Sequence, residues 1–196
     1  MTRPLRLAVL LSGSGRTLEN LLDRIAAGTL PAEVALVVSN KPLVRGVAIA
    51  TRAGIPVEVM PRDGTPTEPW SEAIFAACRR AGAELVVMAG FLALLRIPAD
   101  FAGRVVNIHP SLLPAFGGKG FHGDHVHRAV LDRGCTVSGC TVHLVDDEYD
   151  HGRILLQLTV PVLRDDTVAS LAARVFAAEC EALPEAIAAI ARDTRA

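Results

Sequence analysis

In the first two-thirds of the chain, short continuous apolar runs alternate with segments in which apolar residues recur at helical spacing. The apolar runs are typical of strands buried on both faces of a parallel sheet, and they cover residues 5–11, 34–38, 57–60, 84–89 and 104–108. Three intervening segments, 17–28, 44–53 and 69–80, have the pattern of amphipathic helices. This alternation predicts βαβ units and a parallel sheet.

The last third has a different pattern. A helix predicted over Val126–Asp132 leads into two longer strand candidates, Thr136–Val145 and Arg153–Val160, which an acidic stretch, DDEYDHG, separates. An alanine-rich helix is predicted over Asp166–Ile190, with Thr167 as its cap and Pro184 as a kink or break. We therefore predict an α/β fold with a Rossmann-like open, mostly parallel sheet flanked by helices and an antiparallel C-terminal portion, in a single domain over residues 1–196.

The amino-acid composition of the chain narrows the classes of partner and the cellular location that we expect. Charged residues make up 21% of the 196, and the net charge of −1 favours neither a nucleic acid nor an anionic membrane as partner. No apolar run approaches the roughly 20 residues of a membrane helix. The four cysteines form no CxxC pair, so we expect reduced thiols and a cytoplasmic location.

A glycine-rich turn, SGSGRT, follows the first strand and opens the first helix. Free backbone N–H groups and the helix dipole favour an anion there. The turn lacks the Gly-Lys-Ser/Thr of a P-loop, and Leu18 replaces the third glycine of a dinucleotide fingerprint. A phosphate monoester held by the N–H groups of Gly15, Arg16 and Thr17 fits best; a tight turn without a ligand is the alternative.

The run VVNIHPS places Asn107 and His109 on the same face of the predicted fifth strand, because side chains alternate along a strand. An amide donor beside an imidazole suits stabilisation of an oxyanion at a carbonyl centre. Asp150, in the acidic loop, would pair with the imidazole and raise its pKa. The chain has no GxSxG elbow, so direct attack by a nucleophile of the substrate is expected.

Several of these residues also have a purely structural interpretation. A histidine at a strand end is usually structural, and the acidic loop suits a solvated hairpin turn. The histidines in HGDHVH have no established zinc spacing, and the acidic loop lacks the EF-hand pattern, so no metal is expected. A mobile lid over residues 117–124 is the preferred interpretation of the glycine-rich segment.

Four motifs, in order, resemble the phosphoribosylglycinamide formyltransferases of purine synthesis: SGSGRTLENLL, AGFLALL, NIHPSLLPAFGGKG and HLVDDEYDHGRIL. The resemblance spans nearly the whole chain. It implies transfer of a formyl group from the co-substrate 10-formyltetrahydrofolate to the glycine amine of 5-phosphoribosylglycinamide, without a metal. The implied partners are these two small molecules, with no nucleic acid and no membrane, and the chain is expected to be a monomer or a homodimer.

The resemblance also implies roles for residues. Asn107, His109 and Asp150 match the catalytic trio, in which protonated His109 and Asn107 stabilise the oxyanion. The ribonucleotide site would comprise Gly13, Ser14, Gly15, Arg16, Thr17 and Glu179. The folate site would comprise Arg62, Leu92, Ala93, Leu94, Leu95, Asn107, Asp146, Asp147, Glu148, Tyr149 and Asp150. The chain departs from the family at FGGKGFHGDHVH, which is longer than the usual segment after LLP.

Three other functions are less favoured. A methionyl-tRNA formyltransferase would be expected to show a further C-terminal RNA-binding domain and a basic surface. A formyltetrahydrofolate deformylase would be expected to show an N-terminal regulatory domain, yet the first predicted strand begins at residue 5. A non-catalytic phosphoribosyl-ligand sensor would not require Asn107, His109 and Asp150.

Overall fold

The structure is a computed structural model, and it describes residues 3–193. Strands and helices alternate as the apolar pattern predicts. In chain order they are β1 (Leu5–Leu11), α1 (Arg16–Ala26), β2 (Ala32–Ser39), α2 (Arg45–Arg52), β3 (Val57–Val59), α3 (Thr67–Arg80), β4 (Leu85–Met88), the 3₁₀ turn η1 (Ala99–Phe101), β5 (Val105–His109), α4 (Asp124–Asp132), β6 (Val137–Leu144), β7 (Ile154–Pro161) and α5 (Val168–Asp193).

All seven strands of the described chain form one sheet in the order β3-β2-β1-β4-β5-β6-β7. The five strands from β3 to β5 pair in parallel, whereas β6 pairs antiparallel with β5 and β7 antiparallel with β6. The predicted fold class, with its antiparallel C-terminal portion, is therefore confirmed. Strand order reverses at β1, which lies between β2 and β4, and ligands of open α/β sheets bind beyond the strand ends at such a point.

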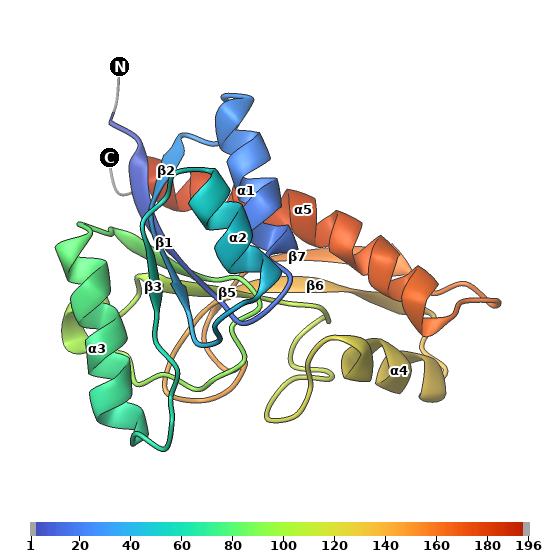
Figure 1. Cartoon of the computed structure of the whole chain (residues 1–196). Coiled ribbons are helices and arrows are strands. Elements are labelled where there is room, and N and C mark those ends of the chain that lie inside the picture. Colours follow the sequence, from blue (N-terminus) through green and yellow to red (C-terminus); the bar gives the residue numbers. More distant parts are fainter. Residues whose placement is uncertain (1–2, 194–196) are drawn as a thin grey trace.

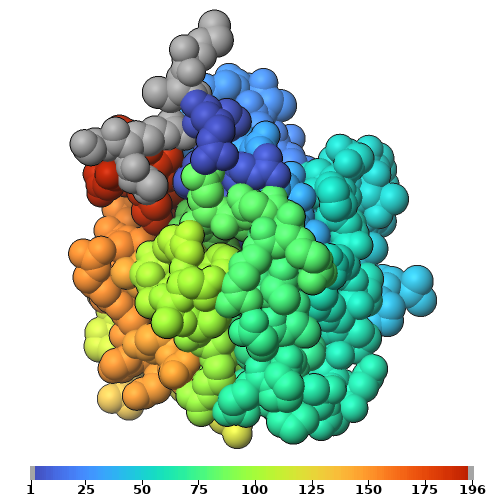
Figure 2. All heavy atoms as spheres, turned by 90° about the vertical axis from the view of Figure 1, so that its left-hand side faces the viewer, coloured from blue at the N-terminus to red at the C-terminus, as the bar shows by residue number. Residues whose placement is uncertain are grey.

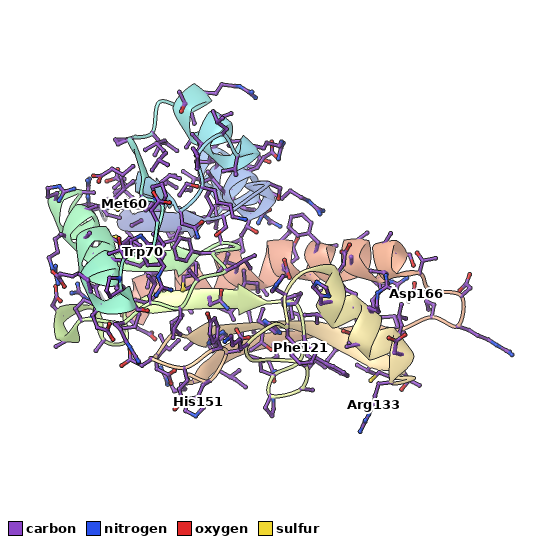
Figure 3. All side chains as sticks on the ribbon, turned by 60° about the horizontal axis from the view of Figure 1, so that its bottom comes forward. Met60, Trp70, Phe121, Arg133, His151 and Asp166 are labelled. Carbon is purple, nitrogen blue, oxygen red and sulfur yellow. The ribbon has the colours of Figure 1, made fainter. Side chains whose placement is uncertain are left out.

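Helices cover both faces of the sheet (Figure 1). One face packs against α1, α2, α4 and α5, with Leu18, Ile49, Val130 and Leu183 among the buried contacts. The other face packs against α3 and η1 through Trp70, Phe75 and Phe101. Figure 2 looks onto this second face, where α3 (green) lies between the orange C-terminal strands and the teal segment around α2 and β3. Trp70 lies beside Met60 (Figure 3), and its indole N–H donates to the Met60 carbonyl at 3.1 Å.

Helix α5 runs through Pro184 without interruption, so the predicted break there is wrong. A proline inside a helix leaves the carbonyl four residues earlier without its usual N–H partner. That carbonyl belongs to Cys180, and it accepts hydrogen bonds from the side chains of Asn20 at 3.0 Å and Arg24 at 3.4 Å, both on α1. Tertiary contacts with α1 thus compensate for the proline.

Candidate active site

A cavity of about 640 Å³ lies beyond the carboxyl ends of β1, β4 and β5. Its wall consists of residues 12–17, 88–95, 107–110 and 118–124, together with His127, His143, Val145, Glu148, Tyr149, Asp150, Ala172, Phe176 and Glu179. Segments that follow three different parallel strands therefore meet the β6–β7 loop and the inner side of α5. Two hydrogen bonds join the ends of β1 and β4: Ser12 N–H donates to Gly90 O at 3.1 Å, and Leu92 N–H to Ser12 Oγ at 3.2 Å.

The glycine turn forms part of the cavity wall. Gly15 caps α1 in the left-handed conformation, with φ of 71°, and no described side chain caps this helix. A Cβ at Gly15 would lie 2.5 Å from the Cα of Gly46 on α2, so a glycine is required at this contact. The Gly13 carbonyl accepts the Gly46 N–H at 3.0 Å, which fixes the turn against α2. The turn thus presents the first N–H groups of α1 to the cavity, as an anion site needs.

Beside this turn, the Arg16 guanidinium lies 3.7 Å from the centre of the Phe176 ring. Glu179 follows Phe176 by almost one turn of α5 and also lines the cavity. Burial raises the pKa of Glu179 to about 7, although the charge of Arg16 opposes the rise. Near neutral pH this carboxyl is therefore ready both to donate and to accept hydrogen bonds, which suits recognition of hydroxyl groups.

The three residues of the predicted trio are neighbours in the cavity wall. His109 Nδ1 lies 3.4 Å from Asp150 Oδ2, and Asn107 Nδ2 lies 3.4 Å from Asp150 Oδ1. Asn107 is paired across the sheet with His143, and its Nδ2 lies 3.1 Å from His143 Nε2. His143 Nδ1 lies 2.8 Å from the carbonyl of Leu144, to which it donates, and His143 Nε2 lies 3.7 Å from Asp150 Oδ1. His143 therefore orients the Asn107 amide.

Electrostatics at the trio differ from the sequence-based expectation. Burial lowers the pKa of His109, and the opposing effects of Asp150 and the Phe116 carbonyl do not cancel it. Asp150 does act to raise the pKa of His109, as expected, but burial outweighs its effect and the net shift is downward. Burial alone would raise the pKa of Asp150, but His143, His109 and the Gly118 N–H together hold it below its ordinary value. Asp150 is thus an anion at neutral pH.

Most residues of the predicted folate site line the cavity, but three do not. Leu92, Ala93, Leu94, Leu95, Glu148 and Tyr149 are in the wall, as are all the residues predicted to bind the ribonucleotide. Arg62 instead donates to Thr65 O at 3.0 Å and lies 5.8 Å from the Trp70 ring, away from the cavity. Asp146 accepts from His151 at 2.8 Å, and Asp147 accepts from the Ile97 N–H at 3.1 Å. These two carboxylates shape the loop that carries Asp150.

The sequence reasoning missed His143 and considered His127 only as a member of a possible metal-binding cluster. His143 became visible only through its antiparallel register with Asn107. His127, on α4, is buried in the cavity wall, and its Nδ1 has no hydrogen-bond partner in the described structure. Among residues 3–193, no group of three or more histidine, cysteine or acidic side chains is placed to hold a metal ion.

None of the four cysteines is in the cavity wall. All four cysteines are free, and burial raises the pKa of Cys78 and Cys140 to about 12, so these two thiols are unreactive.

None of the helices between residues 3 and 193 combines the length and apolar character needed to span a bilayer.

Comparison with known proteins agrees with this geometry. A sequence model of the formyl transferase family matches residues 5–187. The chain belongs to the formyl transferase family.

The similar proteins are named as phosphoribosylglycinamide formyltransferases, glycinamide ribonucleotide transformylases or purine biosynthetic proteins. The chain is 40% identical over 197 residues to a chloroplastic phosphoribosylglycinamide formyltransferase of Arabidopsis thaliana, across 96% of this chain and 66% of the relative. It is 42% identical to the trifunctional purine biosynthetic protein adenosine-3 of Drosophila melanogaster, of which it spans only 14%. A crystal structure of glycinamide ribonucleotide transformylase 1 from Symbiobacterium toebii superimposes with a TM-score of 0.90 at 39% identity, covering 98% of this chain and 90% of that one.

Proposed function

We propose that the chain transfers the formyl group of 10-formyltetrahydrofolate to the glycine amine of 5-phosphoribosylglycinamide, in purine biosynthesis. The observation that carries the proposal is that Asn107, His109 and Asp150 line the same cavity as the glycine turn, whose free N–H groups suit an anion. A substrate with a phosphate at one end and an amine at the other fits this arrangement. The names of the similar proteins support the same substrate.

The ribonucleotide phosphate would bind the turn formed by Gly13, Ser14, Gly15, Arg16 and Thr17, with Glu179 on the ribose hydroxyls. The pterin of the folate would bind against residues 92–95 and 148–150. We assign no folate contact to Arg62, Asp146 or Asp147, because they lie outside the cavity wall.

In the proposed reaction the substrate amine attacks the formyl carbon and forms a C–N bond. An N–H of Asn107, released from its 3.4 Å contact with Asp150, donates to the oxygen that becomes an oxyanion, and the positive charge of protonated His109 stabilises that oxygen. Asp150 accepts the proton of the attacking amine, and the proton passes to the folate nitrogen as its C–N bond to the formyl carbon breaks. Because burial disfavours the imidazolium, the negative charge of Asp150, 3.4 Å from Nδ1, is what makes protonation of His109 accessible.

The proposal includes several further points. The enzyme would need no metal, bind no nucleic acid or membrane, act as a monomer or a homodimer, and work in the cytoplasm as a single domain spanning residues 1–196. The balanced charge of the chain, with 20 basic and 21 acidic residues, supports small molecules as its ligands.

The test is a folate absorbance assay with the purified chain and 10-formyltetrahydrofolate, with and without glycinamide ribonucleotide. Release of tetrahydrofolate only when the ribonucleotide is present is the expected result. Release without it would mean hydrolysis and a deformylase. Ribonucleotide binding without any release would leave a phosphoribosyl-ligand sensor and refute the transferase.

A further inference from the structure

The segment Phe116–Gly118 reaches back from the glycine-rich connection to both members of the buried His109–Asp150 pair. His109 Nε2 lies 2.8 Å from the carbonyl oxygen of Phe116, and the N–H of Gly118 donates to Asp150 Oδ2 at 2.9 Å. Two backbone groups, separated only by Gly117, therefore contact the imidazole and the carboxylate. Neither group belongs to the catalytic trio.

We propose that residues 116–118 are a positioning segment, which orients His109 and Asp150 and stabilises the charged form of this pair through its own peptide groups. The carbonyl of Phe116 presents the negative end of its dipole to the imidazole, and the N–H of Gly118 presents a positive end to the carboxylate. Each peptide group thus faces the ring or carboxylate whose charge it complements. Backbone dipoles held in place in this way do not need to reorganise when the charge forms.

The local conformation is adapted to these contacts. Phe116 has a φ of 54°, a left-handed conformation that is uncommon for residues other than glycine. A Cβ at Gly117 would lie 2.4 Å from Leu113 Cδ2 and 3.3 Å from the Cβ of Asp150, so only glycine lets this peptide approach the carboxylate so closely. Gly118 has a φ of 94°. Backbone strain of this kind persists where the surrounding structure holds it, which here includes the two contacts to the pair.

The base of the segment is fixed to the sheet. Thr141 Oγ1 donates to Ser111 O at 2.7 Å and accepts from Leu113 N–H at 3.0 Å. Ser111 Oγ in turn donates to the carbonyl of Ala115 at 2.5 Å. Hydrogen bonds to Thr141 on β6 therefore fix the residues that precede the segment, and this limits where residues 116–118 can lie.

The balance of charges around the pair explains why such a segment matters. The other groups that face the pair are Asn107 on β5, His143 on β6 and His127 on α4. Burial and His143 both disfavour the imidazolium, while Asp150 and the Phe116 carbonyl favour it. Burial disfavours the carboxylate as well, and the Gly118 N–H is among the groups that favour it. Without the segment, burial would lower the pKa of His109 further, and it would raise the pKa of Asp150.

The inference rests on the proposed function for its catalytic meaning, but its first test needs no substrate. Gly118→Ala and Gly120→Ala form a matched pair, because their φ angles are 94° and 95° and neither has an atom within 4 Å of an added Cβ. Both variants strain the same loop to a similar degree, yet only the N–H of Gly118 contacts Asp150. The titration of His109 in the free protein is followed by NMR of its ring protons, with thermal unfolding of each variant as a control for folding.

We expect Gly118→Ala to move the Asp150-linked acid step of this titration up by roughly one pH unit, since hydrogen bonds to charged groups are the stronger ones. Gly120→Ala should leave the titration unchanged. In Gly118→Ala, the acid limb of the pH profile of kcat should move up by the same amount as the titration. At pH values below that limb, kcat should be about tenfold lower than in the unmodified protein. Equal behaviour of the two variants, in either direction, would overturn the proposal.

Gly117→Ala is the second variant, and its Cβ would displace the same peptide because it would lie 2.4 Å from Leu113 Cδ2 and 3.3 Å from Asp150 Cβ. It should move the titration in the same direction as Gly118→Ala. An unchanged titration in a folded Gly117→Ala protein would also overturn the proposal. If the titration moves as expected but the enzyme releases no folate with glycinamide ribonucleotide, the proposed function fails while the positioning segment stands.

Discussion

The contact between Gly15 and Gly46 makes a quantitative test of the glycine turn possible. Gly15 and Gly28 both have left-handed φ angles, 71° and 70°, and they lie at opposite ends of α1. An added Cβ at Gly28 meets nothing within 4 Å, whereas at Gly15 it would lie 2.5 Å from Gly46 Cα and 3.1 Å from Ile49 Cδ1. The variants Gly28→Ala and Gly15→Ala therefore separate the conformational cost from the cost of the close approach.

The left-handed conformation costs a residue with a Cβ about 1–2 kcal/mol. Gly28→Ala should lose about that much stability, a fall in Tm of roughly 2–8 °C for a chain of this size. Overpacking adds about 1–3 kcal/mol, so Gly15→Ala should lose about 2–5 kcal/mol. Displacing the turn should also weaken a charge-assisted hydrogen bond to the phosphate, so KM for the ribonucleotide should rise about 10–100-fold.

Urea unfolding gives the two free energies, and initial rates at varied ribonucleotide concentration give KM. Gly28→Ala should leave KM unchanged, because it lies beyond the far end of α1 from the turn. Equal losses of stability in the two variants would refute the argument from the Gly46 contact. An unchanged KM in Gly15→Ala would place the phosphate elsewhere.

Three further predictions concern ionisable groups. His109→Ala and Asp150→Asn should each lower kcat by roughly 10²–10⁴-fold while the Kd for the ribonucleotide, measured by calorimetry, stays the same; near-normal turnover would show that these residues are wrongly assigned. Since the pKa of Glu179 is raised to about 7 from 4.5, the folded protein loses stability as pH rises between these values. Glu179→Gln should be more stable than the wild type by about 1–3 kcal/mol at pH 8 and equally stable at pH 4. The variant should also bind the ribonucleotide more weakly. A difference in unfolding free energy that stays constant across pH would contradict this reasoning. Asp166 lies just before α5 (Figure 3), where the Arg174 guanidinium holds the pKa of its carboxyl well below the ordinary 3.8. Asp166→Asn should therefore lower Tm at pH 7. The difference in Tm from the wild type should shrink as pH falls below 3.8. A difference that stays the same at pH 3 would exclude this ion pair as the cause.

The strand and helix pattern was readable from the sequence because buried parallel strands are continuously apolar and amphipathic helices are periodic. Leu5–Leu11 was predicted to the residue, whereas α3 and α4 begin two residues before their predicted starts. The continuity of α5 was not readable. It depends on Asn20 and Arg24 of α1 reaching the Cys180 carbonyl, a contact between residues far apart in the chain.

The candidate site was predictable where one strand or one turn carries it. Asn107 and His109 share a face of β5 by strand alternation, and the glycine turn has its signature in consecutive residues. His143 could not be inferred, since its place beside Asn107 depends on the register between β5 and β6. The acids of the β6–β7 loop are neighbours in sequence, but the loop turns only Glu148 and Asp150 toward the cavity and leaves Asp146 and Asp147 outside it.

The antiparallel pairing of β5 with β6 also determines where the chain tolerates insertions and deletions. Ladder pairing sets Asn107 opposite His143 and His109 opposite Thr141, whatever the length of the connection between the strands. Doubling the length of a flexible connection costs only about 0.6 kcal/mol in closure entropy, so residues added near Lys119 or Phe121 would leave the paired side chains in place. A single residue inserted within β6 would instead turn His143 to the opposite face of the sheet. Length variation among relatives should therefore accumulate at the tip of this connection and be absent from Val137–Leu144.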